Sequence, residues 1–352
     1  MESRREAQIE MLPATTTSRR LALAALALGL VVSVGAATPD LRGPYLGQAP
    51  PGPAPKLFAP GVVNAGMPTR DAAFTPDGKE FYFSVFVPGF VHAAILVTRL
   101  EGEQWTQPQV AVFASDARFR SIEPCISPDG KRFFFVSDRP AGLHVTQPGP
   151  FGIWVMERAG AGWGPPSRLG PTINSDGESY FPSLTRDGTL YFTREVKDGA
   201  SAIYRARSQD GEYTTAERLP DAVNLGKTRY NAFVAPDESY VIVPAYGRED
   251  SLGGTDYYIV FRRATDRWSE PINLGPEINT AGNDEYSPFV SRDGRYFFFM
   301  SVREEMPRIS PAEKLTVEGL LAASRTAATR VPGLYWMDAG FIGALRKRAV
   351  FR

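Results

Sequence analysis

The sequence predicts an all-β fold: a single β-propeller of five four-stranded blades. Three observations predict it: a turn motif occurs five times, each repeat carries four short strand patterns, and the repeats are about fifty residues long. The turn aspartates are separated by 52, 58, 50 and 56 residues, and they are Asp77, Asp129, Asp187, Asp237 and Asp293. Repeats of this length with four strands each are typical of propeller blades.

The clearest turn is Ser-Pro-Asp-Gly at 127–130, and the apolar run RFFFVS follows it. Proline presets φ at the first central position of a turn, and glycine accepts the positive φ that closes a tight hairpin. The apolar runs after the turns lack the alternation of a half-exposed strand. We therefore expect both faces of these strands to be buried between neighbouring blades.

One fourth strand is missing from the repeats and is found at the N-terminal side. Five third-strand patterns are followed by only four fourth-strand patterns, and residues 56–63, KLFAPGVV, match the missing one. Pairing this segment with the last blade would close the ring and remove both exposed edges. A six-bladed ring is the alternative. The last blade carries an insertion, residues 303–332, and Ser310, Pro311 and Glu313 predict that it contains a short helix.

The N-terminal region predicts export. Residues 1–37 form a signal peptide, whose apolar part, 21–37, follows Arg19 and Arg20 and is short for a membrane span. We expect a periplasmic or secreted protein, with an uncleaved anchor as the alternative and no other membrane contact. Residues 38–56 are rich in Pro and Gly and predict an extended linker, and residues 57–352 form the propeller.

Composition excludes several partners. The chain has 39 basic and 39 acidic residues, so it lacks the basic surface that nucleic-acid binding favours. Cys125 is the single cysteine, and we expect a small buried side chain without a disulfide. The only histidines, His92 and His144, fall in predicted loops and argue against a histidine metal centre. We expect a monomer with no metal and no cofactor.

Several motifs resemble a known family. TPDG at 75–78, SPDG at 127–130, LGPTIN at 169–174 and WSEPINLGPEIN at 268–279 resemble the WD40-like PD40 repeats related to the TolB β-propeller domain. The resemblance covers about residues 56–345. It departs from the family pattern at Arg186 and Arg292, where Pro is usual, and at Glu238, where Gly is usual. The resemblance implies a propeller but no single activity.

Polar residues gather where the innermost strands begin, which predicts a ligand site at the mouth of the central channel. The candidates are Arg70, Asp71, Glu123, Glu178, Arg229, Asn231, Asp284 and Glu285, together with Tyr180, Tyr230 and Tyr286 at one aligned position. The structural interpretation is that such acids cap backbone amides or pair with an arginine of a neighbouring blade.

Three functions remain open. The first is a recognition module that binds a protein partner or a glycan at the channel mouth. The second is a glycan-active hydrolase using Asp71, Glu123 and Glu178, since a glycosidase needs two carboxylates roughly 5–10 Å apart. The third is a scaffold in an envelope complex. No GxSxG motif is present, and the lack of a complete catalytic constellation favours the first. The loops at 174–178 and 279–285 are rich in Asn, Asp and Gly, and turn formation explains them better than calcium binding.

Overall fold

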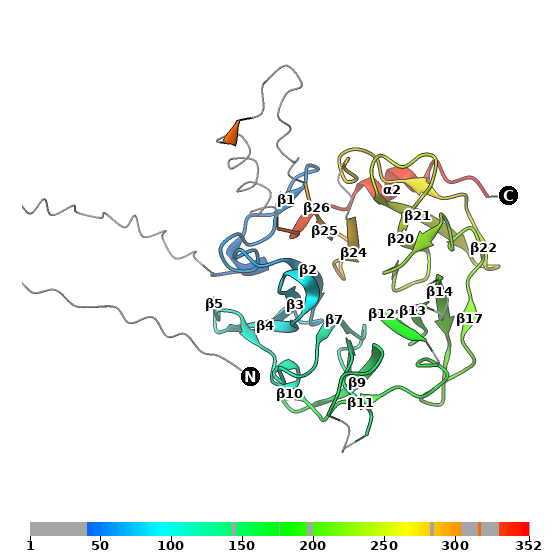
Figure 1. The fold of residues 1–352 in the computed structure, drawn as a ribbon. Helices are drawn as coiled ribbons and strands as arrows, with labels where there is room; N and C mark the ends of the chain where they lie inside the picture. Colours follow the sequence, from blue (N-terminus) through cyan, green and yellow to red (C-terminus); the bar gives the residue numbers. More distant parts are fainter. Residues whose placement is uncertain are drawn as a thin grey trace, which may run out of the picture. The chain divides into compact units, whose positions relative to one another are not determined.

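The computed structural model describes residues 41–142, 146–175, 177–195, 200–281, 285–303, 316–317 and 331–351. These residues form five antiparallel blades arranged in a ring (Figure 1). Each blade has four strand positions, some of them divided into two short strands. The predicted five-bladed, all-β propeller is therefore confirmed.

The strands follow one order in every blade, from the channel outward. The innermost strands are β2 (Thr69–Phe74), β7 (Ser121–Ile126), β12 (Glu178–Leu184), β18 (Thr228–Arg229) with β19 (Phe233–Val234), and β24 (Glu285–Val290). The second strands are β3 (Glu80–Phe86), β8 (Arg132–Ser137), β13 (Leu190–Glu195), β20 (Tyr240–Tyr246) and β25 (Tyr296–Ser301). The third strands are β4 (Ala93–Glu101), β9 (Gly152–Ala159), β14 (Ser201–Ala206), β21 (Thr255–Arg263) and β26 (Gly333–Asp338).

The outermost strands are short. They are β5 (Gln104–Trp105) with β6 (Gln109–Val110), β10 (Gly162–Trp163) with β11 (Ser167–Arg168), β17 (Glu217–Arg218), β22 (Arg267–Trp268) with β23 (Ile272–Asn273), and β1 (Lys56–Leu57). A two-stranded hairpin, β15 (Ser208–Gln209) and β16 (Glu212–Tyr213), extends the third blade. The 3-10 turns are η1 (Tyr45–Gly47), η2 (Pro88–Phe90) and η3 (Val112–Ala114), and helix α2 (Phe341–Arg346) follows the last blade.

The repeated turn forms the predicted hairpin between the first and second strands. In the first blade, Gly78 has a φ of 68° and its N–H donates to the Thr75 carbonyl at 2.9 Å. The Thr75 hydroxyl donates to the Asp77 carboxylate at 2.6 Å, which explains why a hydroxyl residue precedes the aspartate by two positions. In the fourth blade Glu238 takes the glycine position with a φ of 56°. Its carboxylate pairs with Arg262 at 2.9 Å.

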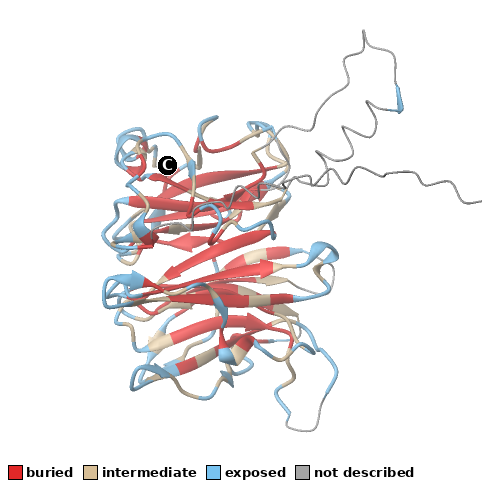
Figure 2. Ribbon diagram, turned by 90° about the vertical axis from the view of Figure 1, so that its left-hand side faces the viewer, coloured by how far each residue is buried: buried red, intermediate tan, exposed pale blue. Residues whose placement is uncertain are grey.

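The apolar runs stack the blades on one another, as predicted. Phe133 and Phe135 of β8 belong to the core between the first and second blades, whereas Phe134 points into the core between the second and third. All three are 0% exposed. In Figure 2 the buried positions fill the strands and the exposed ones gather in the loops at their ends. Since successive side chains of a strand point to opposite faces, a blade buried on both faces needs an unbroken apolar run.

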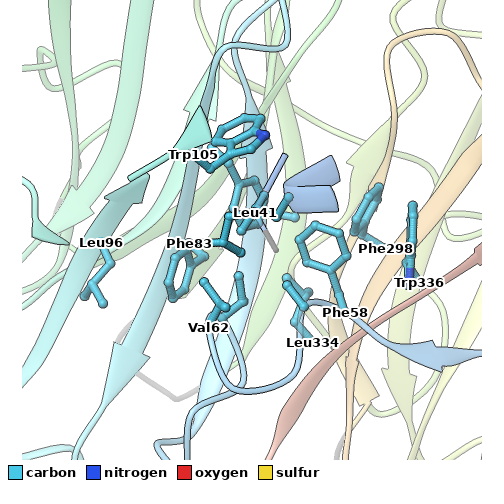
Figure 3. Close-up of a cluster of buried hydrophobic side chains, with 14 of the residues drawn as sticks. Leu41, Phe58, Val62, Phe83, Leu96, Trp105, Phe298, Leu334 and Trp336 are labelled. Atoms are coloured by element: carbon cyan, nitrogen blue, oxygen red, sulfur yellow. The ribbon is translucent and has the colours of Figure 1, made fainter. Parts of the chain in front are cut away.

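The N-terminal strand closes the ring as predicted. Strand β1 pairs with β26, with Lys56 opposite Trp336. Phe58, which is 0% exposed, then packs against the Phe81 ring of the first blade. It also packs against Phe298 of the last blade (Figure 3). The preceding segment departs from an extended linker, because Leu41 is buried in the same cluster and Trp105 donates to the Gly43 carbonyl. Burial of apolar side chains holds this segment on the propeller.

Some predicted features lie outside the described residues: the signal peptide 1–37, the insertion helix that begins near Ser310, His144 and Asp284. Within the described ranges, no helix has both the length and the apolar character needed to cross a bilayer.

Candidate functional site

All five innermost strands are distorted at the same position, where the pairing register shifts. A non-glycine residue with positive φ occupies this position in every blade: Asp71 (60°), Glu123 (57°), Phe181 (51°), Asn231 (50°) and Ser287 (63°). Such a φ is uncommon outside glycine and persists only where surrounding contacts enforce it. We call these five residues the bulge ring. Each is less than 9% exposed.

Four residues, Arg70, Asp71, Glu123 and Asn231, form a hydrogen-bonded group that we call the axial cluster. The Arg70 guanidinium donates to Glu123 Oε1 at 2.5 Å and to Asp71 Oδ1 at 3.1 Å. Asn231 Nδ2 donates to Glu123 Oε1 at 3.3 Å, and the Phe181 backbone N–H donates to Glu123 Oε2 at 2.6 Å. Glu123 thus connects its own blade to the first, third and fourth blades.

The charges in the axial cluster are strongly perturbed. Burial raises the pKa of Glu123 to about 7, and the neighbouring Asp71 carboxylate adds to the rise while Arg70 opposes it. Arg70 is shared by two carboxylates, and they raise its pKa against the opposing effect of its own burial. The guanidinium therefore stays charged, and burial favours the protonated form of Glu123 more than it is favoured in an exposed glutamate.

Aromatic rings lie next to the axial cluster. The Arg70 guanidinium carbon is 4.6 Å from the centre of the Tyr286 ring, and the Tyr230 and Tyr286 rings are 6.4 Å apart. Burial, followed by the charges of Glu195 and Glu123, raises the pKa of Tyr180. The predicted alignment of Tyr180, Tyr230 and Tyr286 agrees with the register, because each precedes a bulge-ring residue.

The other predicted site residues are held elsewhere. Glu178 accepts a hydrogen bond from the Phe151 backbone N–H at 3.3 Å and makes no hydrogen bond to the axial cluster within the described part of the chain. The Arg229 guanidinium donates to backbone carbonyls, including that of Ser201 at 2.7 Å. Glu285 is 0% exposed, and its Oε1 accepts from Ser301 at 3.0 Å. Burial raises the pKa of Glu285 to about 7.

The arrangement bears on the catalytic candidates. Asp71 and Glu123 share one arginine, and both accept hydrogen bonds from backbone N–H groups of neighbouring strands. These contacts match the structural interpretation of the sequence, in which such acids cap backbone amides or pair with an arginine. Glu178 is not joined to them. Among the described residues no group of three or more His, Cys, Asp or Glu side chains has a metal-binding arrangement. His92 is exposed in the loop between β3 and β4.

A cavity of about 90 Å³ lies on the other side of the bulge ring, toward the hairpin turns. All five blades line it, mainly with apolar side chains such as Phe74, Ile126, Leu184, Phe233 and Val290. Asp71, Glu123 and Ser287 also line it, at the bulge-ring end, and Arg292 lines it at the hairpin end. We call the surface that carries these hairpins the hairpin face, and the opposite surface, with the loops before the innermost strands, the mouth face.

The sequence analysis missed one repeated structural residue. In four blades an asparagine side chain binds both the N–H and the C=O of a third-strand residue. For example, the Ile203 N–H donates to Asn224 Oδ1 at 2.7 Å. These residues are Asn64, Asn174, Asn224 and Asn279. The signal was the repeated Ile-Asn or Val-Asn pair after each fourth strand. In the first blade Asp116 holds the equivalent sequence position after β6 and pairs with Arg118 at 2.6 Å.

Neither a protein-family model nor a curated protein sequence matches the chain. Solved structures match it at low identity. TolB from Acinetobacter baumannii is 19% identical over 68% of this chain and 50% of that one, with a TM-score of 0.44. The putative TolB from Agrobacterium tumefaciens is 15% identical over 72% and 79%, with a TM-score of 0.45.

A third match is the α-L-arabinofuranosidase from Lactobacillus brevis, 12% identical over 78% of this chain and 92% of that one, with a TM-score of 0.45. The chain spans half the length of the Acinetobacter baumannii TolB. Similarity at this level carries no argument about activity. The described residues form a five-bladed β-propeller, and its matches include two structures named TolB or putative TolB.

Proposed function

We propose that the protein is a non-catalytic recognition propeller that binds a protein partner at its mouth face. The supporting observation is a set of large apolar side chains exposed at this face: Met67 (45%), Val87 (45%), Val91 (64%), Tyr246 (50%) and Leu252 (46%). They belong to the loop before β2, the loop between β3 and β4, and the end of β20 with the loop that follows it. Apolar side chains concentrated on one face favour protein contact.

The same observation favours a protein over a glycan. Sugar sites combine aromatic platforms with converging polar groups, whereas four of these five exposed side chains are aliphatic or thioether groups. The polar groups that the sequence offered for a sugar, Asp71 and Glu123, are buried and bonded to Arg70. Their role is to hold the blades together beneath the face rather than to meet a ligand on it.

Hydrolysis is disfavoured by the same geometry. A glycosidase acid and its partner carboxylate must both reach the substrate. Asp71 and Glu123 are each 3% exposed, and Glu178 lies apart from the axial cluster. With the predicted signal peptide, the partner would be a periplasmic or extracellular protein, and a scaffold role in an envelope complex is a special case of this proposal.

The test is capture of a partner with matched surface variants. The full-length protein, expressed in its own host with an affinity tag, is crosslinked in cells and its bound proteins are compared between variants. Val91→Asp and Leu252→Asp change the mouth face. Val350→Asp is the control, because Val350 is 57% exposed and its carbonyl accepts a hydrogen bond from the Glu270 N–H beside the outermost strand β22, away from the mouth-face loops. We expect one partner to be retained by the wild type and by Val350→Asp and lost from the mouth-face variants.

Two outcomes would contradict the proposal. Equal capture by all three variants would remove the mouth face as the binding surface. Turnover of an oligosaccharide that Glu123→Gln abolishes, with the fold intact, would establish the hydrolase instead.

A further inference from the structure

The cavity on the hairpin side of the bulge ring has the composition of a ligand site and lies opposite the proposed partner-binding face. A water molecule needs about 10–15 Å³ of such space, so a cavity of about 90 Å³ holds a fragment of several heavy atoms. Its walls come from all five blades, so it lies on the channel axis. It continues into a groove of about 900 Å³ between the fifth and first blades, because Phe74, Phe289 and Arg292 line both.

Arg292 stands at the junction of the cavity and the groove. It occupies the turn position at which three other blades have proline (Pro76, Pro128 and Pro236), so a long cationic side chain replaces a small apolar ring. Arg292 is exposed, and its guanidinium has no hydrogen bond or ion pair with the residues that the structure describes. An arginine beside an apolar cavity is suited to bind a carboxylate.

The inner end of the cavity sets the orientation of a ligand. Asp71 and Glu123 line it there, and their oxygens, which accept hydrogen bonds from Arg70, would face an anion at that end as acceptors rather than donors. Ser287 also lines this end, is 1% exposed, and its Oγ has no hydrogen-bond partner within the described ranges. A buried hydroxyl without a partner favours a ligand that carries one polar group at its inner end.

We propose that the hairpin face binds a small organic carboxylate with an apolar body of one ring or a short chain. The apolar body lies in the channel against Phe74, Ile126 and Phe233, and the carboxylate is bound by Arg292 at the rim. A hydroxyl at the far end of the ring bonds to Ser287. This site goes beyond the proposed partner binding, since it uses the other face, other residues and another class of ligand.

Titration calorimetry of the full-length protein with three probes tests the proposal. The probes are 3-(4-hydroxyphenyl)propionate, unsubstituted 3-phenylpropionate, and the neutral amide of the first. We expect one site for the hydroxylated acid. An exposed ion pair contributes up to about 1 kcal/mol, so the amide should bind up to about fivefold more weakly.

The variants assign each contact. Arg292→Gln should remove the preference for the acid over its amide, while Arg186→Gln should keep it. Arg186 is the matched control because it holds the same turn position in the third blade, is exposed, and does not line the cavity. Ser287→Ala should remove the preference for the hydroxylated ring. Cys125→Met, which adds volume at the cavity wall, should weaken all three probes.

The proposal fails if none of the probes binds the folded wild type, or if the amide and the acid bind equally. It also fails if Arg292→Gln and Arg186→Gln have the same effect. Arg292 is an exposed turn residue, so we expect Arg292→Gln to fold like the wild type. Its result therefore does not depend on whether the cavity-wall variant Cys125→Met folds. Loss of partner capture at the mouth face would leave these titrations unchanged, so the two proposals fail separately.

Discussion

Glu123 should make the propeller less stable as the pH rises toward neutrality. Its pKa is raised from 4.5 to about 7 in the folded protein, mainly by burial. A carboxyl whose folded pKa is raised binds its proton more tightly in the native state than in the unfolded state. The stability that it contributes is fully present below pH 4.5 and is lost as the pH rises through 7.

The magnitude follows from the two pKa values. Linkage between pH 5.0 and 7.5 for a group that changes from 4.5 to about 7 gives a loss of about 2–3 kcal/mol in the free energy of unfolding. The turn aspartates Asp77 and Asp129 change the stability in a separate, more acidic pH range. Their pKa values are lowered by hydrogen bonds, notably from Thr75 and Ser127, although burial opposes this. The stability that they contribute is lost only below pH 4.

The assay is urea unfolding at pH 5.0 and pH 7.5, followed by circular dichroism, for the wild type, Glu123→Gln and Glu178→Gln. The glutamine keeps the size of the side chain and removes the titration, although its amide meets either Arg70 or the Phe181 N–H and lowers stability at both pH values. We expect the difference in the free energy of unfolding between the two pH values to shrink by about 2–3 kcal/mol in Glu123→Gln. It should be unchanged in Glu178→Gln, which lies outside the axial cluster.

The reasoning is refuted if Glu123→Gln has the same pH dependence as the wild type. Glu285, whose pKa burial also raises to about 7, should act in the same direction. The double variant Glu123→Gln, Glu285→Gln should therefore have the flattest profile between pH 5.0 and 7.5, and a steeper profile than either single variant would contradict the linkage.

Three further predictions concern the fold. Phe58→Ala should destabilise by about 3–5 kcal/mol because Phe58 is 0% exposed and joins the first and last blades, and urea unfolding measures it. Gly78→Ala should cost about 1–2 kcal/mol for its positive φ alone. Gly130→Ala should cost more in the same assay, since its Cβ would lie 2.8 Å from Pro76, and equal losses would refute the contact. Asn224→Asp should cost about 3 kcal/mol because it puts a carboxylate oxygen against the Ile203 and Leu219 carbonyls, and an unchanged melting temperature would refute this.

The fold was predictable because each blade repeats the same local signals. The turn motif set the hairpins at Asp77 and its four equivalents, and the unbroken apolar runs such as the one at Phe133–Phe135 required burial on both faces. The shortage of one fourth strand also led to the closure by Lys56 and Leu57. The packing of Leu41 against this closure was not predictable, because a Pro- and Gly-rich segment gives no periodic signal.

The candidate site was predictable only in part. Arg70, Asp71, Glu123 and Asn231 come together as their positions at the start of the innermost strands suggested. Glu178 and Glu285 do not join them. Glu178 lies three residues before the bulge-ring residue Phe181, and Glu285 lies two residues before Ser287. Side chains at different positions along a strand point to different neighbours. The distortion shared by the five strands has no sequence signature, since Asp, Glu, Phe, Asn and Ser occupy it.

The sequence alone determined the repeat, the strand order and the way the ring closes, because these follow from periodicity and turn chemistry within each fifty-residue unit. It favoured five blades, and the structure excluded the six-bladed alternative for the described residues. Only the tertiary structure decided whether the polar residues are buried, which groups they bind and how their pKa values change. Whether Glu123 meets solvent or an arginine depends on where five separate strands converge, and that convergence buries it, raises its pKa and binds it to three other blades. The cavity beside Arg292 has the same origin, because no single blade contains enough of its wall to reveal it.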